Sequence, residues 1–126
     1  MTDLELREYV ADLNSFLNSK PWLDIDVIQC SSHSAVLHCG IDLTEGPEIE
    51  IKFDSIFFVS FLMSWKTDTS RPVLEILTGK DAVRVNMLYQ IEQGHHLFAF
   101  SPEYLEGDTR FVIAARSISW RKIKEC

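Results

Sequence analysis

The sequence lacks the long apolar runs and the leader pattern of membrane and secreted proteins. Its longest apolar stretch, Ile56 to Met63, is interrupted by Ser60 and is far shorter than the roughly 20 residues that a membrane-spanning helix needs. The first residues are acidic and do not form the basic and apolar regions of a secretion signal. We therefore predict a cytoplasmic protein that does not bind membranes.

Cysteine is scarce as well. The chain has only Cys30, Cys39 and Cys126, an odd number without the regular spacing of a disulfide framework. In a reducing compartment each is expected to be a free thiol. No repeat, low-complexity segment or linker divides the 126 residues, and this length is typical of one domain. We predict a single domain over residues 1–126.

Motifs of nucleotide-binding and hydrolytic enzymes are also missing. GxGxxG, GxSxG and HExxH do not occur. Gly79-Lys80 fails as a phosphate-binding loop, because Leu74 stands where the first glycine belongs and Asp81 where Ser or Thr is required. We predict no cofactor, and the missing motifs favour a binding protein over an enzyme.

The sequence does contain the pattern of an N-terminal helix and enough apolar residues for a core. Hydrophobic residues make up 46% of the chain. Between Thr2 and Asn18 they recur at helical spacing, and Thr2 with Glu5 fits a capping box. Pro21 prevents the helix from continuing.

The remaining segments predict about seven strands. Residues 22–43 fit a hairpin in which residue 25 pairs with 41 and residue 27 with 39. The other strand-like segments are 48–53, 56–63, 73–77, 83–91, 96–101, 110–116 and 118–123, with loops at 67–72 and 102–108 and a bulge or turn near Arg116-Ser117. Short connections favour antiparallel neighbours. We predict an α+β fold, with the helix packed on a bent, mainly antiparallel sheet that approaches a partial barrel.

Charge is distributed unevenly along the chain. The net charge is −7, and residues 1–54 hold eleven acidic but only three basic residues. This balance disfavours nucleic acid and favours a basic protein partner. We predict a non-enzymatic interaction module that inhibits or neutralises such a partner. The candidate contact residues are Asp24, Asp26, Asp42, Glu48 and Glu50.

The alternative is a small-molecule-binding domain. If residues 83–91 and 96–101 form a hairpin, Tyr89, His96, Phe98 and Phe100 share one face and could line the mouth of an aromatic cup. In the simpler interpretation, these residues belong to a filled hydrophobic core or to its rim and bind no ligand. The sequence does not separate a filled interior from a hollow one.

A cluster of potential metal ligands lies in the first hairpin. Its members are Cys30, His33, His38 and Cys39, with Asp26 as a further ligand. Their spacing matches no zinc motif, so we predict no metal. A hydrolase built on Cys30 and His38 is the weakest hypothesis, since nothing in the sequence activates the thiol of Cys30 or of Cys39.

Two further possibilities are RNA binding by the basic C-terminal segment and self-association through an edge strand. Trp120 could stack on RNA among Arg110, Arg116, Arg121, Lys122 and Lys124. The simpler interpretation is that these cations pair with the acidic first half of the chain. Pro72 opens the segment Val73 to Leu77, which favours an edge strand that could pair with a second copy as a homo-oligomer.

Overall fold

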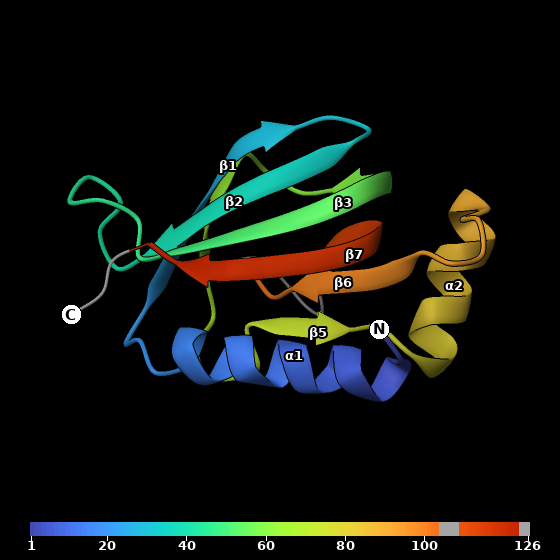
Figure 1. The fold of residues 1–126 in the computed structure, drawn as a ribbon, viewed down its shortest axis with the longest axis horizontal. Helices are drawn as coiled ribbons and strands as arrows, with labels where there is room; N and C mark the ends of the chain where they lie inside the picture. The colour runs from blue at the N-terminus through green and yellow to red at the C-terminus, as the bar shows by residue number, and fades with distance from the viewer. Residues whose placement is uncertain (104–108, 124–126) are drawn as a thin grey trace.

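The computed structural model describes residues 1–103 and 109–123 of the chain (Figure 1). Its elements, in chain order, are α1 (Asp3–Leu17), β1 (Leu23–Cys30), β2 (Ser34–Gly40), β3 (Ile49–Ser60), β4 (Ser64–Thr67), β5 (Leu74–Ile76), α2 (Gly79–Tyr89), β6 (His96–Phe100) and β7 (Phe111–Lys122). Most of the predicted loop 102–108 lies outside the described residues, as do Lys124 and Cys126.

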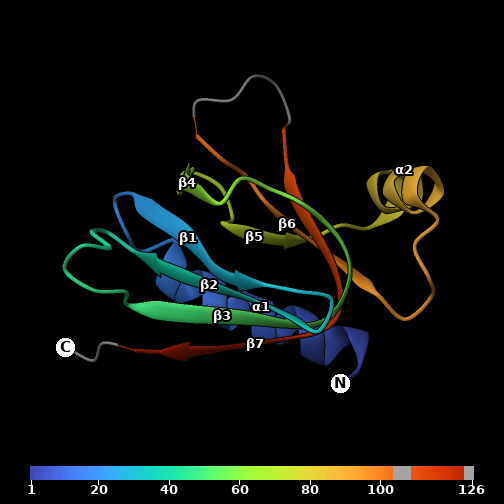
Figure 2. The same ribbon diagram turned by 90° about the horizontal axis from the view of Figure 1, so that it is seen from above.

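The strands form one antiparallel sheet in the order β4-β1-β2-β3-β7-β6-β5. The sheet curls strongly, so its two ends approach each other (Figure 2). Near this closure Thr67 forms an isolated bridge with Pro102, and the Asp68 amide donates to the Ser101 carbonyl over 3.0 Å. The predicted α+β fold with a bent, partly closed sheet is confirmed.

Helix α1 lies against one face of the sheet (Figure 1). Thr2 caps its first turn, and the Glu5 side chain accepts the Thr2 amide in return, as predicted. One stripe of the helix is buried, and its members are Leu6, Val10, Leu13 and Leu17. The other wall of the core is the inner face of the sheet, where Phe53, Phe98 and Phe100 are fully buried and their rings contact one another.

Asn14 of α1 and the C-cap residue Asn18 bind the outer edge of β5 and the residues just before it. The Asn14 side chain donates to the Leu74 carbonyl over 2.8 Å and accepts the Leu74 amide over 3.0 Å. Asn18 accepts the Val73 amide and donates to the Arg71 carbonyl. Strand β5 is an edge strand, as predicted from the segment 73–77, but α1 already occupies the backbone groups of Leu74 that an incoming strand would use.

The prediction of a strand over residues 83–91 is wrong, because residues 83–89 belong to helix α2. Apolar residues alternate at 83, 85, 87, 89 and 91, which satisfies a strand pattern. Over the same residues Val85, Leu88 and Tyr89 satisfy a helical spacing. The helix ends at Gln90, which adopts a left-handed conformation with φ 49°.

The register predicted for the first hairpin is wrong by two residues. Ile25 pairs with Cys39 and Val27 with Leu37, not with residues 41 and 39. A shift of two leaves every side chain on its predicted face. Leu23, Ile25, Val27, Leu37 and Cys39 are accordingly buried in the core.

Strands β3 and β7 each join two segments that were predicted as separate strands. Residues 49–60 form the single strand β3, which bends at Ser55 (φ 57°) and carries a register shift between Ile56 and Phe58. Strand β7 is likewise continuous, with Arg116 and Ser117 both exposed where its alternation reverses. The short strand β4 was not predicted, and it includes Thr67 from the expected loop.

Candidate functional site

A row of polar side chains crosses five strands on the sheet face opposite α1. Backbone pairing places Ser64 (β4) beside Asp26 (β1), Asp26 beside His38 (β2), His38 beside Glu50 (β3) and Glu50 beside Arg121 (β7). Three contacts order this row. Ser64 Oγ donates to Asp26 over 2.6 Å, Arg121 Nε donates to Glu50 over 2.8 Å, and His38 Nε2 lies 3.1 Å from Glu50 Oε1. The row is therefore held in place by rigid strands and by its own contacts.

Glu50 interacts with both of its neighbours in the row, His38 and Arg121. The hydrogen bond from Arg121 and the contact with His38 lower the pKa of its carboxyl group below the ordinary value of 4.5. The negative charge of Glu50 is thus stabilised at neutral pH, but His38 and Arg121 of the same protein already interact with it.

The five predicted contact residues do not have equal surroundings. Glu48 binds Lys20 over 2.9 Å, and Glu50 binds Arg121. Asp42 accepts the amide and hydroxyl of Thr44 in the turn after β2. Asp24 and Asp26 lie two residues apart on the outward face of β1, and neither forms an ion pair with a described residue. Among the five predicted contact residues, we therefore expect Asp24 and Asp26 to carry most of the negative charge that faces outward.

Exposed apolar residues flank the two aspartates. Trp22, immediately before β1, is 42% exposed, and its indole N–H donates to the Ile41 carbonyl. Ile28, on the other side of the pair, is 54% exposed. Aromatic residues such as Trp are enriched in protein interfaces.

Ser64 and His38 are not neighbours in the row. Asp26 stands between Ser64 and His38 in the sheet, and the Ser64 hydroxyl donates to Asp26. The acceptor of the Ser64 hydroxyl is therefore the Asp26 carboxylate and not the His38 imidazole.

The potential metal ligands of the first hairpin are not brought together. Cys39 points into the core, and burial raises the pKa of its thiol far above the ordinary range. Cys30 pairs with Ala35 whereas His38 pairs with Asp26, which separates Cys30 and His38 by about 10 Å along the strands. Among the residues that the structure describes, no group of three or more His, Cys, Asp or Glu side chains could hold a metal ion.

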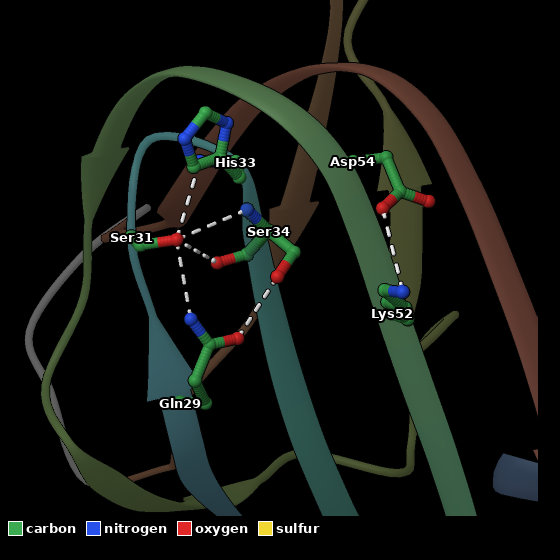
Figure 3. Close-up of polar contacts among 6 residues, drawn as sticks. All are labelled: Gln29, Ser31, His33, Ser34, Lys52 and Asp54. Atoms are coloured by element: carbon green, nitrogen blue, oxygen red, sulfur yellow. Dashed lines mark hydrogen bonds and ion pairs between the residues drawn. The ribbon is translucent and has the colours of Figure 1, made fainter.

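His33 lies in the turn between β1 and β2 (Figure 3). Ser31 Oγ accepts the amides of His33 and Ser34 and a hydrogen bond from the Gln29 side chain. Ser34 Oγ donates to Gln29 in return over 2.9 Å. The polar residues of this turn therefore order the backbone of the hairpin.

The residues of the predicted aromatic cup do not share one wall. Phe98 and Phe100 are fully buried against Phe53 in the core. Tyr89 is half exposed on α2 and stacks on Phe58, at 4.1 Å between ring centroids and 25° between planes. The cup depended on the 83–91 strand, and the structure forms a helix there.

The basic residues of β7 contact other parts of the chain. Arg121 binds Glu50, which confirms for this residue the predicted pairing with the acidic half. Lys122 Nζ lies 3.7 Å from the centroid of the Phe16 ring. The Trp120 ring contacts Tyr9 and Phe16 of α1, so it is part of the helix–sheet packing.

Comparison with known proteins supplies no functional assignment. The chain matches no family model, no curated protein and no solved structure. Within the described part of the chain, no helix is long and apolar enough to cross a membrane.

Proposed function

We propose that this protein is a non-enzymatic interaction module that binds a basic protein partner through the outward face of its sheet, as an inhibitor or neutralising protein would. The observation that carries the proposal is the ordered polar row across five strands, which includes Asp26 and has Asp24 beside it. Carboxylates held on strands lose little freedom on binding and attract a cationic surface over a distance that depends on salt.

The structure changes which residues are expected to steer the partner. Glu48 and Glu50 are bound to Lys20 and Arg121, so they contribute less outward field than the sequence implied. Asp24 and Asp26 supply the attraction, and Trp22 and Ile28 supply the apolar contact. The proposed partner surface is basic with an apolar centre.

Two isosteric double variants test this assignment. D24N/D26N removes two charges from the proposed face, and E8Q/D12N removes two from exposed positions on α1. Tagged proteins are incubated with native lysate, eluted by a salt gradient and analysed by mass spectrometry. A basic protein held by the wild type and by E8Q/D12N, but released at lower salt from D24N/D26N, is the expected result. Equal elution from all three forms, or no retained basic protein, contradicts the proposal.

A further inference from the structure

A groove separate from the polar row lies between α2 and the sheet. Helix α2 stands at the end of the sheet where β3 finishes and β7 begins (Figure 1). The groove has a volume of about 400 Å³. Volumes of this size are typical of small-molecule sites, which start near 300 Å³.

One side of the groove is apolar and aromatic. Phe58 and Val112 line it from the sheet, and Leu88 and Tyr89 line it from α2. The stack of Phe58 on Tyr89 joins the two elements. Leu88 is 64% exposed and Tyr89 50%, so α2 presents apolar surface that the described chain leaves uncovered. An apolar, flat body fits this wall.

The groove is also lined by charged side chains. Arg84 of α2 and Arg110, just before β7, both line it, opposed by Asp81. Arg110 Nε also lies 3.4 Å from Glu75 Oε1, so this carboxylate offsets part of its charge. The Arg110 side chain is 21% exposed, and a planar guanidinium binds a ligand carboxylate through paired N–H donors.

We propose that this groove binds a small amphipathic carboxylate. The carboxylate accepts hydrogen bonds from Arg110 and from Arg84, and the apolar body lies along Phe58, Leu88 and Tyr89. A planar guanidinium matches a carboxylate in geometry as well as in charge. The site uses none of the residues of the polar row, so it goes beyond the proposed function and stands independently of it.

A pair of matched probes tests the proposal in the full chain. 2-Naphthoate has an aromatic body and a carboxylate, and 2-naphthamide has the same shape without charge. Isothermal titration calorimetry is expected to show naphthoate binding roughly tenfold more tightly, which is the ratio that one charge-assisted hydrogen bond can supply. Amide shifts in an NMR titration are expected to concentrate on α2 and on the adjoining ends of β3 and β7.

Four variants sharpen this test. R110Q and R84Q should each remove most of the preference for naphthoate, and R84Q keeps the test valid if loss of Arg110 impairs folding, because Arg84 is exposed. D81N should strengthen naphthoate binding, because Asp81 lines the same groove. R116Q, an exposed arginine of β7, is the matched control and should change nothing. Equal affinity for the two probes, an unchanged preference in R84Q, or shifts outside the groove would overturn the proposal.

Discussion

The two helices of this protein differ in how they are attached to the rest of the chain. Helix α1 has 15 residues, a complete capping box and four buried apolar side chains. Helix α2 has 11 residues, no side-chain hydrogen bond from its N-cap Thr78 and no buried residue. Both are amphipathic, but only α1 covers its apolar stripe. Both helices therefore have the amphipathic pattern, but only α1 has a capping box and a buried apolar stripe.

This difference has a physical consequence for stability. An isolated helix shorter than about 12–15 residues is marginal in water, so α2 depends on its contacts with the sheet. The main aromatic contact described for it is the Phe58–Tyr89 stack. Helix α1 is expected to unfold only with the core, and α2 to open by itself. A helix of this kind can form one wall of a binding groove without being part of the core.

The largest expected effect comes from truncating a leucine on each helix. L13A removes a fully buried side chain of α1 and should lower the free energy of unfolding by about 2–5 kcal/mol. L88A removes one that is 64% exposed on α2 and should change it by less than about 0.5 kcal/mol. Urea denaturation measures both, and similar losses would contradict the distinction between the helices.

The next effect concerns the clamp between α1 and β5. N14A removes both hydrogen bonds to Leu74 and should cost about 1–3 kcal/mol, because the amide and carbonyl of Leu74 lose their partner. It also opens the edge of β5 to a second strand. Sedimentation velocity is expected to show self-association of N14A at concentrations where the wild-type protein does not self-associate. Full retention of stability would argue against the clamp.

The two N-caps give a smaller, matched pair. T2A deletes the hydroxyl that accepts the Glu5 amide and should cost about 1 kcal/mol. T78A alters an N-cap that makes no side-chain hydrogen bond and should have little effect. Thermal unfolding followed by circular dichroism separates the two outcomes, and an equal drop in melting temperature would show that capping does not distinguish the helices.

The smallest effect is a dependence on pH through Glu50. Its pKa is lowered in the folded protein, so its contribution is present above the ordinary value of 4.5 and is lost as the pH falls through the lower, folded value. The stability difference between wild type and E50Q should therefore be largest at neutral pH and shrink below pH 4.5. Urea titrations across this range measure it, and R121Q should weaken the same dependence. A difference that grows towards acid would contradict the assignment.

Local patterns in the sequence account for much of the fold. The capping box and apolar stripe predicted α1, and alternation predicted which side chains of β1 and β2 face the core. Alternation has a period of two, so it could not detect a register error of two residues. Residues 83–91 satisfied a strand and a helix equally, and the choice depends on whether a neighbouring strand is available for pairing. The Asn14 clamp depends on where α1 lies in the fold, which no local pattern specifies.

The candidate sites were only partly predictable for the same reason. Asp24 and Asp26 were identified because acidic residues alternate along one predicted strand. The sequence predicted that Arg121 pairs with the acidic half of the chain, but the particular partner, Glu50, lies 71 residues away and is specified only by the pairing of β3 with β7. The groove at Arg110 was missed because it requires α2 as one wall. The position of Arg110 in the same groove as Phe58 and Tyr89 becomes visible only in three dimensions.

Native-state hydrogen exchange tests the contrast between the helices most directly. Amides on the buried stripe of α1, such as those of Val10 and Leu13, are expected to exchange only through global unfolding, with the same free energy as the core strands. Amides of α2 are expected to exchange through a local opening of much lower free energy, and saturating 2-naphthoate should slow them selectively. Equal protection of α1 and α2 in the unliganded protein would contradict the account.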